Sequence, residues 1–397
     1  MNRILIAAGL AGAIAALVTS LVVPAVERLA RTLRAFDHPG GRRQHVSVVP
    51  RLGGVAIAAG IGLGAGIMAL VHWTEWGRAI PKVELATFAG ATSLIFLVGV
   101  VDDILGVSMA KKFLVQFLAA SLLVYVGWSF SSLKLPVLGL VELGVFGPAL
   151  SVVWIVGVTN AINLLDGLDG LASGVTAIIA SGVLVLALFQ ENLMTVLLMA
   201  AVAGACLGFL RHNWEPARIF MGDSGALTLG FLLGTMSLHA SLKSSSAVAI
   251  LVPILALGLP VIDTLMVMVV RFLNAPKGPA VRRLLRMFRA DRQHLHHILE
   301  RLGPSRRRIV TGIYAVAVVF CAMAVLVAVR NQMALGFTLL TAQIVFVLAM
   351  RWLGLRRAAK ELAAAKRAAL REELGGEQTQ EQPAGFRIEP RSDSSAP

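Results

Sequence analysis

Four polar side chains recur at three-residue steps in a very apolar chain: Asn160, Asn163, Asp166 and Asp169. On an unbroken helix each step turns the side chain by about 60°, so the two asparagines would share a face and Asp169 would point away. A helix that ends near Gly167 would let both carboxylates turn back toward the amides. Because carboxylate and amide oxygens suit hard cations that keep some water, we predict a site for magnesium and phosphate. A polar helix end that faces water is the alternative.

A second acidic group, Asp102 and Asp103, follows an apolar run in which ionised acids are costly. Adjacent carboxylates can bind a metal, accept a proton from a nucleophile, or do both. Lys112 and Gln116 follow at helical i, i+4 spacing at the head of the next apolar segment. The lysine could hold a phosphate or extend to the membrane interface, and the sequence leaves both interpretations open.

A third polar group surrounds Asp223, between two further apolar segments. Asp223 directly precedes the second of these segments, which is also the pattern of a helix cap without chemistry. The neighbouring Asn213, Arg218 and Phe220 favour a ligand site instead. An aromatic ring can stack on a base while an arginine binds phosphate.

The loop at 37–54, DHPGGRRQHVSVVPRLGG, carries basic residues that include His45 and Arg51. Its prolines stiffen the chain, and its glycines allow the backbone to approach a ligand closely. These features suit a loop that binds an anionic substrate, with His45 and Arg51 as candidate contacts. A positively charged cytoplasmic loop without a ligand is the alternative.

The loop at 271–308 contains eleven basic residues and the string DRQHLHH. Its histidines, His294, His296 and His297, suggest zinc, but a closed zinc site needs four ligands and no cysteine lies nearby. We favour contacts of these histidines and of Arg292 with the diphosphate or sugar of an anionic substrate. A basic amphipathic helix on the membrane surface is the alternative.

The composition identifies the class of protein that must position these groups. Of the 397 residues, 57% are hydrophobic and 15% are charged, and many uncharged stretches are long enough to cross a bilayer. An ordinary soluble domain is therefore excluded. The net charge of +14 could suggest a nucleic-acid partner. In a membrane protein it reflects topology and attraction to anionic membrane lipids instead, so we expect no nucleic-acid binding.

Hydropathy predicts an all-α, polytopic membrane protein with about eleven transmembrane helices. The expected spans are 3–24, 53–73, 84–101, 112–130, 145–163, 171–189, 192–210, 223–240, 247–270, 309–329 and 332–351. The loops and tail on one side carry 30 Lys and Arg residues, and the other side carries 6. The positive-inside rule therefore places the N terminus outside and the C terminus in the cytoplasm. All five polar groups then lie on the cytoplasmic side.

The segment after the last span differs in composition from the rest of the chain. From Arg356 it reads RRAAKELAAAKRAALREEL, a strong helix former, and after Gly375 it becomes rich in Glu, Gln, Pro and Ser. We therefore expect a membrane-embedded domain over 1–353, and a cytoplasmic charged helix with a disordered tail over 354–397.

The five groups, in this order, carry a resemblance to a known family. DHPGGRRQH with VPRLGG, VVDDILG, NAINLLDGLDGLASG, NWEPARIFMGDSG and DRQHLHH resemble the polyprenyl-phosphate N-acetylhexosamine-1-phosphate transferases of glycosyltransferase family 4, over residues 1 to about 353. The UDP-N-acetylglucosamine–undecaprenyl-phosphate branch is the most similar. The resemblance implies a magnesium-dependent enzyme, with Mn²⁺ as a substitute, in the bacterial inner membrane with a cytoplasmic active site. It would move a sugar-1-phosphate from a UDP-N-acetylhexosamine to undecaprenyl phosphate, release UMP and start a cell-envelope glycan. A homodimer is left open.

The resemblance also implies roles for individual residues. Asp223 matches the magnesium ligand, with Asn163 as a second ligand. The candidate catalytic residues are Asp102 and Asp103, which match an acid pair, and Asp166 and Asp169, which match carboxylates of the nucleotide pocket. Phe220 matches a position that stacks on uracil, and His294, His296 and His297 match the histidine motif. The other expected substrate contacts are Asn160, Lys112, Asn213, Arg51, His45 and Arg292.

Two alternative functions stay open at this point. The sister enzyme that transfers phospho-N-acetylmuramoyl-pentapeptide would carry similar groups, and only the resemblance of PRLGG and HLHH favours the N-acetylglucosamine branch. A secondary transporter would carry acids near the centres of its spans, whereas Asp102, Asp166 and Asp223 lie at predicted span ends.

Overall fold

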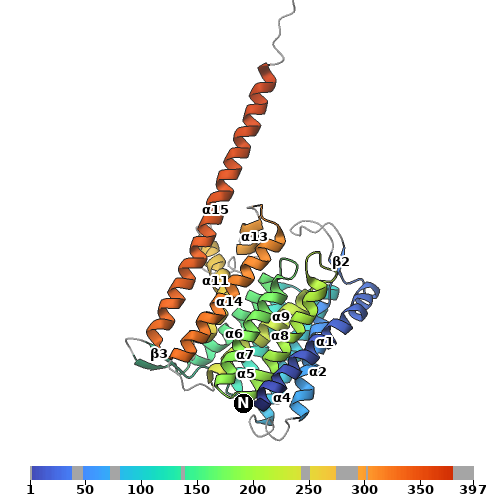
Figure 1. The fold of residues 1–397 in the computed structure, drawn as a ribbon, viewed down its shortest axis with the longest axis vertical. Coiled ribbons are helices and arrows are strands. Elements are labelled where there is room, and N and C mark those ends of the chain that lie inside the picture. The colour runs from blue at the N-terminus through green and yellow to red at the C-terminus, as the bar shows by residue number, and fades with distance from the viewer. Residues whose placement is uncertain are drawn as a thin grey trace, which may run out of the picture.

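The computed structural model describes residues 2–37, 48–71, 81–135, 139–242, 251–273, 294–300 and 303–378. These residues form a bundle of helices from which the last helix projects (Figure 1). The helices are α1 (Asn2–Thr32), α2 (Gly53–Val71), α4 (Lys82–Leu105), α5 (Met109–Tyr125), α6 (Phe146–Leu165), α7 (Leu171–Phe189), α8 (Leu193–Asn213), α9 (Gly222–Leu242), α10 (Leu251–Ala256), α11 (Gly258–Leu273), α13 (Leu295–Glu300), α14 (Arg306–Arg330) and α15 (Met333–Gln378). The strands are β1 (Phe36–Asp37), antiparallel to β2 (Val49–Pro50), and β3 (Ser132–Leu135), antiparallel to β4 (Gly139–Glu142).

The helices confirm the prediction of an all-α, polytopic membrane protein. Among the described residues, nine helices are long and apolar enough to cross a membrane: α1, α2, α4, α6, α7, α8, α9, α14 and the first part of α15. Of the two other predicted spans, one corresponds to α5, which has only 17 residues, and the other to α10 and α11 together. The total of eleven spans and the direction of the termini stay predictions.

Three of the predicted spans differ from the helices of the structure. α1 continues past residue 24 to Thr32, and an ion pair of 2.8 Å between Arg31 and Glu27 lies on its last turns. The predicted span 247–270 is divided at Leu257, because Pro260 has no amide hydrogen to donate to the preceding turn. α15 runs without a break from Met333 to Gln378, past the predicted end of the last span at residue 351, and the side of the membrane on which it ends stays a prediction.

The bundle is built around α9, whose side chains are buried along almost its whole length. Small residues let its neighbours approach closely, as is usual between membrane helices. A Cβ at Gly99 of α4 would lie 2.5 Å from the Cα of Ser224, and one at Gly54 of α2 would collide with the backbone of Gly225. The end of α4 and the start of α2 therefore meet the start of α9, which brings the VVDDILG and MGDSG motifs together.

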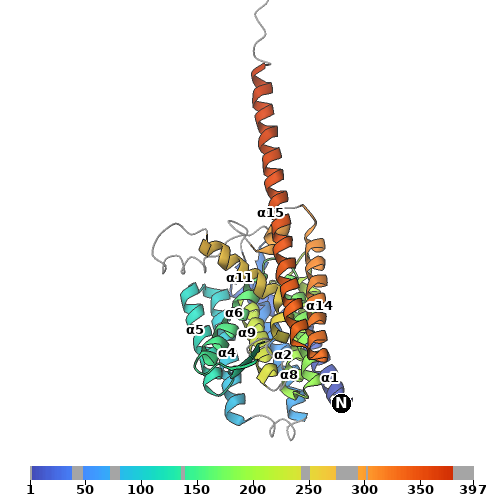
Figure 2. The ribbon, with the colours of Figure 1, turned by 90° about the vertical axis from the view of Figure 1, so that its left-hand side faces the viewer.

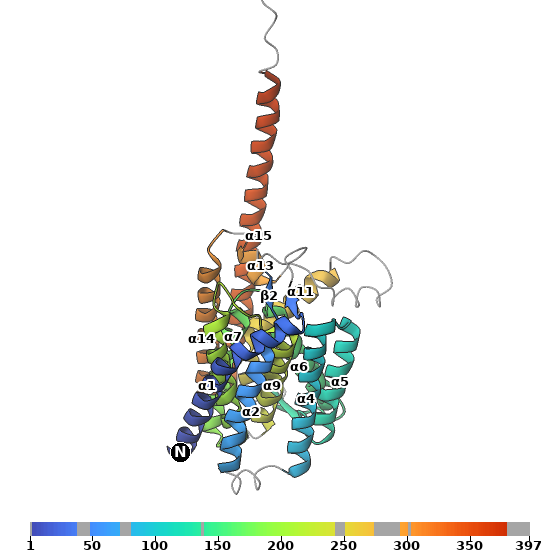
Figure 3. The same cartoon turned by 90° about the vertical axis from the view of Figure 1, so that its right-hand side faces the viewer.

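The remaining helices surround this centre. α1 packs against α2 and α8, and α6 packs against α9. α5 and α14 lie on opposite sides of the bundle (Figures 2 and 3). The β1–β2 pair and α13 lie at the end of the bundle from which α15 projects (Figure 1). The polar motifs gather at this same end.

Candidate active site

Asp103 fixes the start of α9. Its two carboxylate oxygens accept hydrogen bonds from the backbone amides of Asp223, at 2.8 Å, and Ser224, at 3.0 Å. A negative charge is favourable at a helix N terminus, where amides lack partners within the helix. Arg51 lies 3.4 Å from the same carboxylate and balances its charge. Gly222 has a φ of 70°, and a Cβ there would collide with Asp103, so this position requires glycine.

Three carboxylates meet where α4 ends and α9 begins. Oxygen atoms of Asp102, Asp103 and Asp223 all lie within 4.8 Å of one another. The Nζ atom of Lys112 donates a hydrogen bond of 2.6 Å to Asp223 and lies 3.3 Å from Asp102. The Asn163 amide lies 3.5 Å from the same oxygen of Asp223. The structure thus assembles groups from three separate sequence motifs, carried by α4, α5, α6 and α9.

This cluster fits a divalent cation of the hard type. Asp103 already uses both oxygens on the α9 amides, which leaves Asp102 and Asp223 as the two carboxylates with capacity for a metal. Two carboxylates and an amide side chain, completed by water or phosphate oxygens, form a donor set that Mg²⁺ accepts. The Lys112 ammonium, between the two carboxylates, shows that the site attracts positive charge.

Asn160 precedes Asn163 by three residues on α6 and is 8% exposed. Its side-chain amide donates hydrogen bonds to the Gln116 side chain on α5 and, at 2.8 Å, to the Val156 carbonyl on α6. Both hydrogens are thus used within the protein. Asn160 joins α5, which carries Lys112, to α6, which carries Asn163, so its position suits an organising role better than the expected substrate contact.

The loop between α6 and α7 forms as the glycines predict, because α6 ends at Leu165 and Gly170 has a φ of 75°. The Asp169 carboxylate accepts a hydrogen bond of 2.9 Å from the Ala217 amide. The Asn213 side chain accepts one of 3.0 Å from the Gly170 amide and donates one of 2.9 Å to the Ile219 carbonyl. Asp169 and Asn213 therefore join this loop to the segment that follows α8.

Asp166, in the same loop, is the C-cap of α6. Burial raises the pKa of its carboxyl to about 7, and the nearby carboxylates of Asp223 and Asp103 add to the rise, while Arg51 opposes it. Because the folded protein binds this proton more tightly than the unfolded chain, the folded state loses stability as the pH rises from the ordinary carboxyl pKa toward 7.

The Asp166→Asn variant should therefore be more heat-stable than the wild type at pH 8, and the difference should shrink toward pH 5. Thermal unfolding of the purified protein with EDTA would measure this, since bound metal would hide the repulsion. Asp169→Asn is the control, because that carboxylate accepts a hydrogen bond from Ala217, and it should give no gain at high pH. Equal gains for Asp166→Asn at both pH values would contradict the assignment.

The segments around Arg51 and Phe220 run side by side. The Phe220 amide donates to the Pro50 carbonyl at 2.9 Å, and the Gly53 amide donates to the Phe220 carbonyl at 3.0 Å. Phe220 is half-buried, and Arg51 reaches Asp103. His45 and Arg292, the other expected basic contacts, lie outside the described residues.

The histidine segment lies against the loop between α6 and α7. A Cβ at Gly167 would collide with the His296 imidazole, so the two residues are in direct contact. Burial, together with His297 and His294, lowers the pKa of His296 to about 3, so this imidazole is neutral at physiological pH. The Nδ1 atom of His297 lies 3.2 Å from Glu300, which also accepts a hydrogen bond from Arg306.

Two residues near this segment were missed by sequence reasoning. Asp263 of α11 lies 2.9 Å from Nδ1 of His294, and Arg351 of α15 donates to Asp263 at 2.6 Å. An acid inside a predicted span is itself a signal of function or pairing, and it could have drawn attention to Asp263. Arg351 gave no such signal, because it stands at a span end where basic residues are common.

The family comparisons agree with this geometry. The glycosyl transferase family 4 sequence model matches residues 85–241, which contain the three clustered carboxylates. The chain is 37% identical to a probable undecaprenyl-phosphate N-acetylglucosaminyl 1-phosphate transferase of Bacillus subtilis, over 79% of this chain and 83% of the relative. It is 34% identical to a decaprenyl-phosphate N-acetylglucosaminephosphotransferase of Mycolicibacterium smegmatis, over 77% and 78%, respectively. It is 33% identical to a phospho-N-acetylmuramoyl-pentapeptide-transferase of Moorella thermoacetica, over 77% of this chain and 94% of the relative. The expected family is confirmed: the chain belongs to glycosyl transferase family 4.

Proposed function

We propose that the protein transfers N-acetylglucosamine-1-phosphate from UDP-N-acetylglucosamine to undecaprenyl phosphate, and releases UMP. The reaction would take place at the cytoplasmic face of the bacterial inner membrane and start a lipid-linked cell-envelope glycan. The observation that carries the proposal is the cluster of Asp102, Lys112 and Asp223 where membrane helices end. A soluble donor and a lipid acceptor can both reach such a place. The names of the Bacillus and Mycolicibacterium relatives, which specify N-acetylglucosamine phosphate transfer to polyprenyl phosphates, support the same substrate class.

The charges of the cluster suit two anionic substrates. In the reaction, an oxygen of the acceptor phosphate bonds to the β-phosphorus of the donor, and the bond from that phosphorus to the bridging oxygen breaks as UMP leaves. Lys112 and Arg51 offer positive charge for phosphates that would otherwise repel each other. Asp102 is placed to accept a remaining proton of the acceptor phosphate. Asp103, bonded to the α9 amides, positions Asp223 in this proposal and is not itself a base.

Magnesium, with Mn²⁺ as a substitute, would be held by Asp223 and Asn163, and would neutralise charge on the donor diphosphate. In this arrangement Asp223 needs to be held firmly. The two hydrogen bonds that Asp103 accepts from the backbone amides of Asp223 and Ser224 supply that rigidity.

The loop between α6 and α7 is proposed as the nucleotide end of the site. This loop lies between the carboxylate cluster and the histidine segment. Its Asp166 is close to the carboxylates of the cluster, and its Gly167 contacts the histidine segment. Asp169 and Asn213 hold this loop to the segment that carries Phe220. We assign uracil stacking to Phe220, and contacts with the diphosphate or sugar to the histidine segment.

The proposal is tested by incubating the purified protein with undecaprenyl phosphate, magnesium and one UDP-sugar at a time, and by measuring UMP. The panel contains UDP-N-acetylglucosamine, UDP-N-acetylgalactosamine and UDP-N-acetylmuramoyl-pentapeptide. We expect the first to give the highest kcat/KM and a lipid-linked product. Release of UMP only from the muramoyl-pentapeptide donor would assign the sister reaction. Transport of a solute without UMP release would overturn the enzyme assignment.

The proposed division into a transferase domain over 1–353 and an appended segment over 354–397 leads to a prediction. Deleting 379–397 should leave kcat/KM within a few-fold of the wild type, because every clustered residue of the site lies before Arg356. The measurement is UMP release by matched amounts of membrane-extracted protein. Complete loss of activity in a well-expressed truncation would contradict the proposed boundary.

A further inference from the structure

The histidine segment is held by a buried cluster that sequence reasoning did not detect. His294, Asp263 and Arg351 are 4%, 5% and 6% exposed, and they come from three different parts of the chain. The Asp263 carboxylate accepts hydrogen bonds from Nδ1 of His294, at 2.9 Å, and from the Leu295 amide, at 3.1 Å. It also accepts one of 2.6 Å from Arg351. Asp263 thus joins the first turn of α13 to the last membrane helix.

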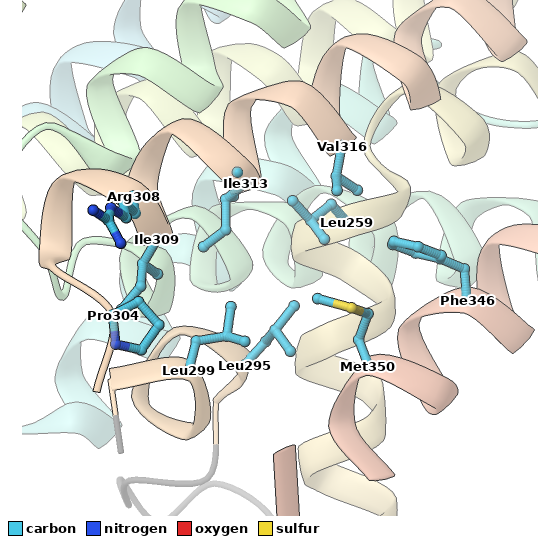
Figure 4. A pocket seen from close by; sticks show the side chains of 11 residues that line it. Leu259, Leu295, Leu299, Pro304, Arg308, Ile309, Ile313, Val316, Phe346 and Met350 are labelled. Carbon is cyan, nitrogen blue, oxygen red and sulfur yellow. The ribbon is translucent and has the colours of Figure 1, made fainter. Parts of the chain in front are cut away.

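Apolar packing and the polar anchor both hold α13, since Leu295 and Ile298 are 6% and 2% exposed. It is a single six-residue helix, and an apolar groove of about 310 Å³ lies beside its leucines, between α13, α11, α14 and α15 (Figure 4). Leu295 and Leu299 face this groove, with Met350 of α15 next to Leu295, and Ile313 and Leu259 across from them. Apolar contacts can slide along such a groove, so the position of α13 along it depends on the directional hydrogen bonds of its polar anchor.

The anchor needs Arg351 because a buried carboxylate is stable only when its charge is compensated. Among the described residues Asp263 has one arginine partner, and the other groups that reach it are an imidazole and a backbone amide. Without Arg351, the carboxylate would favour water or a different arrangement of α13. The His296 contact with Gly167 would then shift with it.

We propose that Arg351 is a positioning residue of the active site. Acting through Asp263, it holds His294 and so sets the histidine segment against the nucleotide loop between α6 and α7. The inference rests on the proposed function for its kinetic consequence. The structural part concerns the contacts of α13 with Asp263 of α11 and Arg351 of α15.

The first test is kinetic. Arg351→Gln should raise the KM for UDP-N-acetylglucosamine about 10- to 100-fold, the size expected when a binding group is displaced, and leave the KM for undecaprenyl phosphate unchanged. Arg351→Lys, which keeps the charge, should recover part of the loss. A general loss of folded protein would instead lower the apparent kcat and leave both KM values alone.

A double-mutant cycle separates action through His294 from an independent effect. If Arg351 acts through the histidine segment, His294→Ala with Arg351→Gln should be no worse than His294→Ala alone. Gln343→Met is the matched control, because Gln343 is also a buried polar residue of α15 but donates to Leu255 of α10, 3.2 Å away. It should leave the KM for the donor unchanged.

The second test needs no substrate. Hydrogen exchange of the Leu295–Glu300 amides should accelerate in Arg351→Gln and stay at the wild-type rate in Gln343→Met. If Arg351→Gln does not fold, the doubly neutral variant Asp263→Asn with Arg351→Gln replaces it, since no unpaired charge is then buried.

An unchanged donor KM together with unchanged hydrogen exchange would overturn the inference, as would fully additive effects in the double-mutant cycle. If the wild type released no UMP, the proposed function would be overturned instead. The hydrogen-exchange result would then decide alone whether Arg351 anchors α13.

Discussion

In the Asp223→Asn variant, UMP release should fall by about 10³-fold or more, the loss typical of removing one electrostatic element from a phosphoryl-transfer site. The Asp223 carboxylate is the point where Lys112 and Asn163 converge, at 2.6 and 3.5 Å. The substitution removes its charge and weakens any cation site there. It leaves the fold intact, because Asp103 holds the start of α9 through backbone amides that the variant retains.

Steady-state kinetics at several magnesium concentrations would measure the effect, and size-exclusion profiles with thermal unfolding would confirm folding. Glu27→Gln is a matched control. It removes an acid near the end of α1 that forms an ion pair with Arg31 of the same helix. It should retain wild-type kcat. Substantial activity of Asp223→Asn at millimolar magnesium would remove Asp223 from the metal site.

In the Asp102→Asn variant, the loss should depend on pH. The second pKa of a phosphate monoester is about 6, so at lower pH the acceptor phosphate must give up a proton before it attacks well. Loss of a base should therefore lower the rate by about 10²-fold or more at pH 5.5, and part of the rate should return as the pH rises to 8. Loss of a metal ligand would instead respond to added magnesium.

Asp103→Asn is the informative comparison, because the two residues are adjacent and have different surroundings. An asparagine offers one acceptor oxygen where the Asp103 carboxylate uses two. One amide at the start of α9 would lose its partner, at a cost of about 1–3 kcal/mol in stability. We expect a lower melting temperature and a pH–rate profile parallel to the wild type. A parallel profile for Asp102→Asn as well would rule out its role as the base.

The sequence determined the class of the protein and most of the chemistry at its site. The apolar spans and the charges that flank them were sufficient for an all-α membrane fold, because a bilayer requires long apolar helices. The glycines after Asn163 predicted where α6 ends, and the structure ends it at Leu165. Asp102, Lys112, Asn163 and Asp223, which the sequence analysis named as separate candidates, lie together in the structure, and their roles in binding stay predictions.

Only the tertiary structure decided which polar residues hold the site together. Asp103 looks like Asp102 in the sequence, but its partners are amides 120 and 121 residues away. Asn160 likewise donates to Gln116, Asn213 accepts from the Gly170 amide, and Arg351 donates to Asp263, over separations of 44, 43 and 88 residues. Local periodicity carries no information about such long-range partners. Whether a polar side chain binds a ligand or anchors a helix is therefore set by the packing of α4, α9 and α15, and a single motif does not reveal it.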